Sequence, residues 1–285
     1  MEQEKFILKY WQRILLLVIP YFFVVGFFQI IGLYVSGADM INIEAAKTSW
    51  QHLIISLFSL IGTLLLLWIF IRIIDNEPFI NLGFNIKNRL NDIWFGVLLG
   101  LLIMGLGYFA LFSMNEIHYS NFKYNNEDII LSILVFIIIA VMEEALFRGY
   151  ILRNLMCSVN KYIALVISAA IFSVMHGANP NMDWLSLLNL FLAGVLLGVS
   201  YVYTKNLWFP IALHFSWNFF QTLFGFNVSG IDSYSLIEFK IKDPNLWNGG
   251  AFGFEGSFLS VIAQVIVIIL IFYYYKNPLK LNSSK

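Results

Sequence analysis

Apolar runs of about 20 residues alternate with short polar stretches along nearly the whole chain. A run of this length can cross a bilayer as a helix. In lipid every backbone amide needs an internal hydrogen-bond partner, and these runs are too long and too uniformly apolar for barrel strands. The pattern therefore predicts an all-α, polytopic transmembrane helical bundle of about eight spans in one membrane domain, residues 1–285. The expected spans have approximate limits 14–36, 52–74, 93–114, 129–155, 162–176, 185–203, 209–223 and 259–275.

The composition supports a membrane protein and excludes other classes. Of the 285 residues, 60% are hydrophobic and 12% are charged, whereas about 25% are charged in soluble domains. The formal net charge of +0 gives no reason to expect a nucleic-acid partner, so the expected partners are membrane lipid and a peptide or membrane-protein substrate. Cys157 is the only cysteine, which rules out an intramolecular disulfide. The first span exceeds the length of a secretory signal, so we expect it to be retained.

Lysine and arginine are distributed unevenly between the two sides of the predicted bundle. The connections on the side of the two termini hold 13 of the 17 basic residues. Cytoplasmic loops of membrane proteins carry such an excess. We therefore expect a multi-pass protein of the cell membrane with cytoplasmic N- and C-termini.

Two connections are unusual enough to be interpreted separately. The stretch 76–92 is either a plain cytoplasmic linker or a short surface helix. The stretch 224–256 is a long external loop, rich in glycine and aromatic residues, that ends in GGAFGFEG. Such loops can cover a cavity, but Trp247, Phe252 and Phe254 are also typical of anchors at the membrane interface. We expect the aromatic residues to be interfacial anchors.

Ionised residues occur inside the fourth predicted span, where each costs about 3 kcal/mol or more near the bilayer centre. Glu144 and Arg148 are four residues apart with the acid first, the favourable order for a helical ion pair. Glu143 lies about 100° around the helix and has no such partner. We therefore expect Glu143 to act as a general base and the Glu144–Arg148 pair to have a positioning role.

Two histidines and an asparagine lie in other spans. His176 closes a span of about 14 residues that the breaker sequence GANP follows, and His214 precedes Asn218 by one helical turn. A span of that length reaches about 21 Å, short of the roughly 30 Å hydrocarbon core. Non-helical backbone at that depth is tolerated where it lines a cavity, so the sequence predicts a polar intramembrane cavity. Singly, each of these residues is also typical of polar contacts between helices.

Three motifs follow one another within residues 129–223, the expected catalytic core: Glu143-Glu144-x-x-x-Arg148, Phe172-x-x-x-His176 and His214-x-x-x-Asn218. In this order the motifs resemble those of the CAAX protease and bacteriocin-processing family of intramembrane proteases, which includes the CAAX prenyl endopeptidases. The resemblance implies an eight-helix bundle around a conical cavity.

The resemblance also implies roles for the motif residues. Glu143 and His176 would activate a water molecule, and His214 and Asn218 would hold the oxyanion of the tetrahedral intermediate. Glu144 and Arg148, supported by Phe172, would orient the substrate or the helix.

Metal dependence is left open by the sequence. The family has been described as metalloproteases, and Glu143, His176 and His214 would supply the His₂Glu set that suits catalytic zinc. The chain has no HExxH motif, however, and Glu143 cannot be both ligand and free base. We therefore favour direct activation of water by Glu143 and His176, without a cofactor.

The predicted function is that of an intramembrane endopeptidase, a hydrolase that cleaves a peptide bond in or near the bilayer. The composition, rich in Ile, Asn, Lys and Phe, favours a bacterial source, where a prenylated CAAX substrate is not expected. An alternative is a non-catalytic bacteriocin immunity or peptide-binding protein on the same fold. A proton-coupled transporter would also use buried carboxylates, but the repeated halves typical of many carriers are absent from the sequence.

Overall fold

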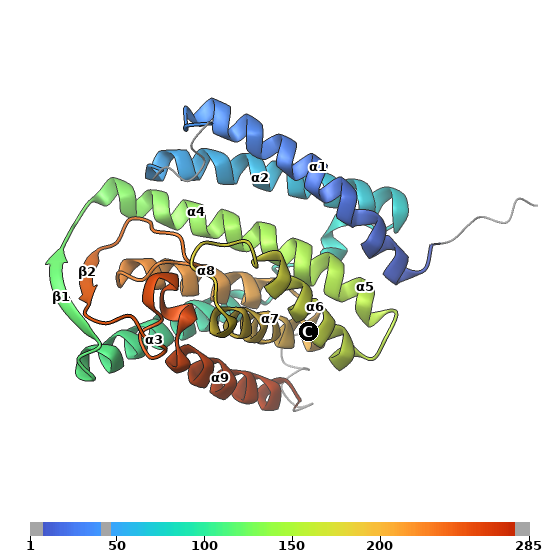
Figure 1. The fold of residues 1–285 in the computed structure, drawn as a ribbon. Helices are drawn as coiled ribbons and strands as arrows, with labels where there is room; N and C mark the ends of the chain where they lie inside the picture. The colour runs from blue at the N-terminus through green and yellow to red at the C-terminus, as the bar shows by residue number, and fades with distance from the viewer. Residues whose placement is uncertain (1–7, 41–46, 277–285) are drawn as a thin grey trace, which may run out of the picture.

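A computed structural model describes residues 8–40 and 47–276 of the chain. Its helices run in chain order and lie roughly parallel or antiparallel to one another in Figure 1. The helices are α1 (Tyr10–Ser36), α2 (Ser49–Ile69), α3 (Leu90–Ser113), α4 (Asn126–Glu144), α5 (Arg153–Met156), α6 (Lys161–Met175), α7 (Trp184–Thr204), α8 (Trp208–Leu223) and α9 (Phe258–Lys276). A π-helix, Phe70–Ile74, extends α2, and a second one, Ala145–Leu152, joins α4 to α5. Short 3₁₀ helices span Phe79–Leu82, Gly250–Phe252 and Phe254–Gly256.

The eight expected spans are all present as helical segments, so the predicted all-α bundle is confirmed. Among the described residues, six helical segments are long and apolar enough to cross a membrane, while α6 and α8 are shorter. Large apolar side chains are exposed along the outer helices, for example Phe23 on α1 and Leu106 on α3. In lipid such surfaces need no protein cover. The chain is a multi-pass membrane protein.

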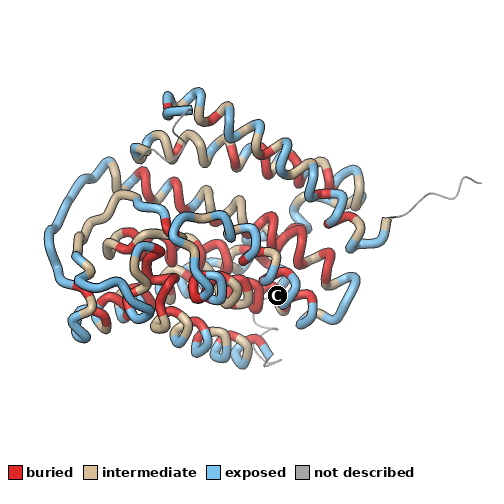
Figure 2. Tube along the Cα trace, viewed as in Figure 1, coloured by how far each residue is buried: buried red, intermediate tan, exposed pale blue. Residues whose placement is uncertain are grey.

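The core of the bundle is formed by α7 and α8, whose residues are mostly buried (Figure 2). α8 packs against α3 on one side and α4 on the other, and α7 packs against α6 and α9. α1 and α2 form an antiparallel pair that lies beside α4 (Figure 1). The third motif therefore lies on a central helix, and the helices that hold the other two, α4 and α6, pack against α8 and α7.

The sequence did not predict a small antiparallel sheet at the end of the bundle away from the first turn of α1 and the last turn of α9 (Figure 1). β1 (Ile117–Phe122) follows α3, and β2 (Ile237–Ile241) lies within the long connection after α8. Pairing of these strands ties that connection to the α3–α4 link. The interpretation of the connection's aromatic residues as interfacial anchors was wrong for two of three, because Phe252 and Phe254 are only 2% and 1% exposed and pack in the core.

The connection 76–92 is more than a plain linker. It forms the short helix Phe79–Leu82, and Leu82 is fully buried. The backbone of Gly83, at φ 120°, accepts a hydrogen bond from the Leu207 amide, and the Tyr201 hydroxyl donates to the Leu82 carbonyl. The connection thus covers the turn between α7 and α8.

The first turn of α1 and the last turn of α9 lie at the same end of the bundle (Figure 1). Arg13 on α1 and Arg153 on α5 both approach Asp75, the residue after the π-helix that extends α2, at 2.7 and 3.8 Å. The terminal residues 1–7 and 277–285 lie outside the described part of the chain. The expected cytoplasmic position of both termini therefore stays a prediction.

Candidate active site

A cavity of about 460 Å³ lies among α1, α2, α4, α6, α7, α8 and the connection after α8. Its wall contains polar members of all three motifs, which come from distant parts of the chain: Glu143, His176, His214 and Asn218. Most of the remaining wall is apolar. The sequence predicted a polar cavity within the bundle, and the structure shows a cavity that these four polar side chains line together.

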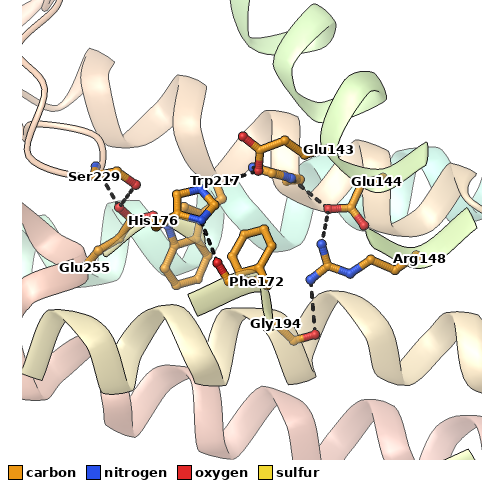
Figure 3. Close-up of polar contacts among 10 residues, drawn as sticks. Glu143, Glu144, Arg148, Phe172, His176, Gly194, Trp217, Ser229 and Glu255 are labelled. Atoms are coloured by element: carbon orange, nitrogen blue, oxygen red, sulfur yellow. Dashed lines mark hydrogen bonds and ion pairs between the residues drawn. The ribbon is translucent and has the colours of Figure 1, made fainter. Parts of the chain in front are cut away.

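Glu143 and Glu144 occupy the last turn of α4, immediately before the π-helix Ala145–Leu152. π-helical segments are rare and are found mostly at functional sites. The two carboxylates point in different directions in Figure 3. Glu143 faces the cavity with its side chain 18% exposed, whereas Glu144 is fully buried. As expected, the two neighbouring carboxylates thus lie in different surroundings.

A chain of polar contacts runs from Glu144 into the core. Its Oε1 accepts hydrogen bonds at 2.8 Å from Arg148 Nη1 and from Nδ1 of His214. Arg148 also donates through Nη2 to the Gly194 carbonyl on α7 at 3.1 Å, and its guanidinium lies 4.7 Å above the Phe172 ring. Neither Glu144 nor Arg148 lines the cavity. The pair therefore connects the end of α4 to His214 on α8 and the π-helix after α4 to α7.

His176 is the residue at which α6 ends. Its Nδ1 lies 2.8 Å from the Phe172 carbonyl, which can only accept a hydrogen bond, so Nδ1 carries the proton. The same reasoning places a proton on Nδ1 of His214, because its partner there is the Glu144 carboxylate. When both rings are neutral, each therefore presents an unprotonated Nε2.

The two Nε2 atoms face one oxygen. Glu143 Oε2 lies 3.6 Å from Nε2 of His176 and 4.0 Å from Nε2 of His214 (Figure 3). This oxygen is buried and accepts no hydrogen bond from the described residues. Two lone pairs directed at a carboxylate oxygen repel it unless a proton or a hydrogen-bond donor lies among them. The arrangement is therefore suited to hold a small donor such as water.

Asn218 lies one helical turn beyond His214 on the same face of α8. It is 5% exposed and lines the cavity. Among the described residues no side chain or carbonyl forms a hydrogen bond with its amide. Its NH₂ group is thus free to donate to a ligand.

The short helices and their ends explain how the three motifs meet, which their sequence positions did not show. His176 lies about 22 Å along α6 from Lys161, whereas His214 lies only about 9 Å along α8 from Trp208. α8 can begin deeper because the turn before it, including the fully buried Leu207, is covered by the connection 76–92. His176 and His214 can therefore meet, because α8 begins further inside the bundle than α6 and His214 needs fewer residues to reach the same level.

The same distances test whether zinc fits the His₂Glu set. Ligands about 2.0–2.1 Å from a tetrahedral ion lie about 3.3 Å from one another. The separations of Glu143 from His176 and His214, 3.6 and 4.0 Å, are both larger. In the described part of the chain, no group of three or more His, Cys, Asp or Glu side chains is arranged to hold a metal ion. The side chains as placed do not fit zinc.

Two cavity residues escaped the sequence analysis. His52 on α2 lines the cavity, although nothing near it in the sequence suggested a partner. Glu255 comes from the connection after α8, is 6% exposed and also lines the cavity. The signal for Glu255 was available, since it is an acid inside the apolar and glycine-rich stretch GGAFGFEG.

One comparison with known proteins bears on these residues. Residues 125–220 match the model of a protein family described as type II CAAX prenyl endopeptidase Rce1-like, and the matched stretch contains all three motifs. No curated protein matches the chain. The family indicates a protease that acts in the membrane. The resemblance predicted from the motifs is thereby confirmed: residues 125–220 are similar to the CAAX prenyl endopeptidases of the CAAX protease and bacteriocin-processing family of intramembrane proteases.

Proposed function

We propose that the chain is an intramembrane endopeptidase in which Glu143 and His176 activate water to hydrolyse a peptide bond in or near the bilayer. The observation that carries this proposal is the buried Glu143 Oε2, which has no hydrogen-bond partner and faces the Nε2 atoms of His176 and His214. A separation of 3.6 Å is too long for a direct hydrogen bond. A water molecule beside the pair can contact both groups.

The first step is attack by this water on the peptide carbonyl carbon. Glu143 accepts one proton from the water as the new C–O bond forms, and the carbonyl π electrons move onto the carbonyl oxygen. His176 orients the water through Nε2, while its Nδ1 is fixed by the Phe172 carbonyl. The tetrahedral intermediate then breaks its C–N bond, and Glu143 returns the proton to the leaving amine. Proton transfer of this kind contributes about 10²- to 10⁴-fold to a rate.

The negative oxygen of the intermediate needs donors. The Asn218 amide can donate directly. His214 can donate from Nε2 only in its doubly protonated form, in which the Glu144 carboxylate at Nδ1 would be its counter-ion. Arg148 in turn holds Glu144 in place through their ion pair. Donors held in place before the reaction stabilise the transition state because they need no reorganisation.

The proposed chemistry uses water and side chains without a metal. Hydrolysis should therefore persist, with an unchanged rate, after dialysis against 1,10-phenanthroline. A loss of activity that added zinc restores would refute the metal-free mechanism and leave the protease assignment intact.

The substrate is proposed to be a peptide or a segment of a membrane protein. The cavity wall is largely apolar, with Phe136, Ile139 and Leu197 among its residues, and such a wall suits an apolar stretch of chain around the scissile bond. The family description names prenyl endopeptidases. For this chain we propose an unprenylated peptide, in keeping with the bacterial composition.

The test compares the wild-type protein with Glu143→Gln on a library of internally quenched peptides in detergent solution. Gln keeps the shape of Glu but accepts no proton, so cleavage should fall by about 10²-fold or more. Glu238→Gln is the matched control, because Glu238 is partly exposed on β2, lies outside the cavity wall and pairs with Lys123 at 3.7 Å. A folded Glu143→Gln protein that cleaves at the wild-type rate would refute the proposal. A wild-type protein that binds peptides without cleaving any would favour the immunity or binding alternative.

A further inference from the structure

Glu255 is a buried carboxylate in the cavity wall that the proposed mechanism does not use. Its Oε1 accepts a hydrogen bond from Trp217 Nε1 at 3.1 Å. Its Oε2 accepts two, from the backbone amide of Ser229 at 2.8 Å and from the Ser229 hydroxyl at 3.0 Å (Figure 3). Glu255 thus joins two parts of the connection after α8 to α8 itself, in addition to the hydrogen bonds that Gln221 and Thr222 of α8 make to the same connection.

The backbone around Glu255 is shaped by glycine. Gly253 has φ 96°, and a Cβ atom there would lie 2.0 Å from the Asn227 carbonyl oxygen. No other residue fits such a position. The turn that Gly253 makes leads directly into the 3₁₀ helix Phe254–Gly256, which places Glu255 in the cavity wall and Phe254 in the core. The glycine-rich backbone of GGAFGFEG thus places the Glu255 carboxylate in the cavity wall.

All three donors to Glu255 are electrically neutral. Among the described residues, no Lys, Arg or His nitrogen lies within ion-pair distance of its carboxylate. Buried charges in proteins are normally paired with an opposite charge, because neutral hydrogen bonds compensate only part of the lost hydration. Oε1 accepts only one hydrogen bond and can accept a second. Glu255 therefore lacks a cation and has room for one.

The rest of the cavity does not supply that cation. The basic side chains in its described wall are Lys47, His52, His176 and His214, and none of them forms an ion pair with Glu255. The Trp217 ring next to Glu255 offers a second attraction for a cation, through its π face. Trp217, Asn218 and Glu255 all line the same cavity, so this corner and the proposed oxyanion site open into one space.

We propose that Glu255 is a specificity-determining residue that binds the cationic side chain of a lysine or arginine in the peptide substrate, close to the scissile bond. This inference rests on the proposed protease function. The substrate cation would supply the missing opposite charge, and Trp217 would pack against the side chain's stem. A peptide with a basic residue at one fixed position would then be selected over its neutral counterpart.

A structural role alone would have a different signature. If Glu255 only fastens the connection to α8, loss of its charge should lower stability without changing which peptides bind. Ser229→Ala is the matched control, since it removes one hydrogen bond to Oε2 and leaves the charge in place. It should lower thermal stability slightly and keep the selection for a basic residue.

The experiment measures peptide binding in a protein that cannot cleave. Glu143→Gln is compared with Glu143→Gln/Glu255→Gln by fluorescence polarisation in detergent solution. The probes are capped Leu/Ala peptides with one lysine placed at each position in turn, and matched peptides with norleucine, which has the same stem without the amine. At one position the lysine peptide should bind about tenfold tighter than the norleucine peptide, and Glu255→Gln should abolish the difference.

Each outcome decides the inference. No preference for lysine at any position in Glu143→Gln would overturn it, even if Glu255→Gln did not fold. A preference that survives in the double variant would also overturn it. Cleavage by the protein with Glu143 intact is measured separately, so an absence of cleavage would refute the proposed function while the binding result still decides whether Glu255 selects a cation.

Discussion

Arg148 is a basic residue in the core of the bundle and is only 1% exposed. It pairs with Glu144 at 2.8 Å, donates to the Gly194 carbonyl and stacks over Phe172. Removing one partner of a buried pair leaves the other charge uncompensated. Arg148→Ala should therefore destabilise the protein by about 3–5 kcal/mol, measured as thermal unfolding in detergent.

Two comparisons make this prediction specific. Arg148→Lys should restore only part of the stability, because an ammonium group cannot make the same forked contacts or stack in the same way. Arg72→Ala, at an exposed position, should change stability little. If Arg148→Ala unfolds at the same temperature as the wild-type protein, the pair is unimportant for the stability of the fold.

Asn218 should matter for rate more than for binding. If its amide donates to the oxyanion, the contact forms fully only in the transition state, so Asn218→Ala should lower kcat by about 10²- to 10³-fold with a small change in KM. Steady-state kinetics on a cleaved peptide measures both constants. Asn91→Ala, at an exposed position of α3, is the control. A rise in KM with normal kcat would instead place Asn218 in substrate binding.

Among single residues, the sequence singled out polar side chains of the motifs that do line the cavity, because ionisable side chains in apolar runs are rare enough to be informative. The meeting of Glu143, His176 and His214 could not be predicted, because it depends on where α6 and α8 begin and end. Glu255 and His52 were missed for another reason. Each lies at the edge of a span or in a connection, where charge is ordinary, and only packing shows that both line the cavity.

Among the helices, α3 can approach α8 closely because Gly100 of α3 has no side chain. A Cβ atom on Gly100 would lie 2.0 Å from the Ser216 hydroxyl oxygen and 2.8 Å from Ser216 Cβ. Gly100→Ala should therefore push α3 away from the helix that holds His214 and destabilise the bundle by about 1–3 kcal/mol. The unfolding temperature and the rate of peptide hydrolysis should both fall.

The same helix offers a matched control. At Gly105 the nearest neighbour of an added Cβ would be the Phe224 ring at 3.9 Å, an ordinary contact. Gly105→Ala should thus be neutral or slightly stabilising, since alanine favours the helix. Ser216→Gly should partly rescue Gly100→Ala by removing the clashing atoms. Equal effects at the two glycines would contradict the close approach of α3 to α8.

Helices were predictable and connections were not, for one physical reason. Each span is encoded locally by its own apolar run, and the helices begin and end within a few residues of the expected limits. The connections 76–92 and 224–256 take their shape from partners far away in sequence. Leu82 is buried by the α7–α8 turn, and β2 forms only because β1 is beside it. Neither partner is visible in the local sequence.

For the molecule as a whole, the two ends of the bundle differ in charge. Among the described residues, the end that holds the first turn of α1 and the last turn of α9 carries most of the basic side chains: Lys9, Arg13, Arg72, Lys87, Arg89, Arg153, Lys161, Lys205 and Lys276. The end with the β1–β2 sheet carries Lys47, Lys123, Lys240 and Lys242. By the positive-inside bias the first end should face the cytoplasm.

Cys157 provides a direct test of this orientation. It is the chain's single cysteine, it is exposed, and it follows α5 at the basic end. A membrane-impermeant maleimide should therefore fail to label it in intact spheroplasts and should label it after the membrane is opened. The reverse is expected for Cys157→Ser/Ser120→Cys, whose new thiol lies on β1 at the other end. Labelling of Cys157 in intact spheroplasts would invert the topology, and the β1–β2 sheet and the connection that bears Glu255 would then face the cytoplasm.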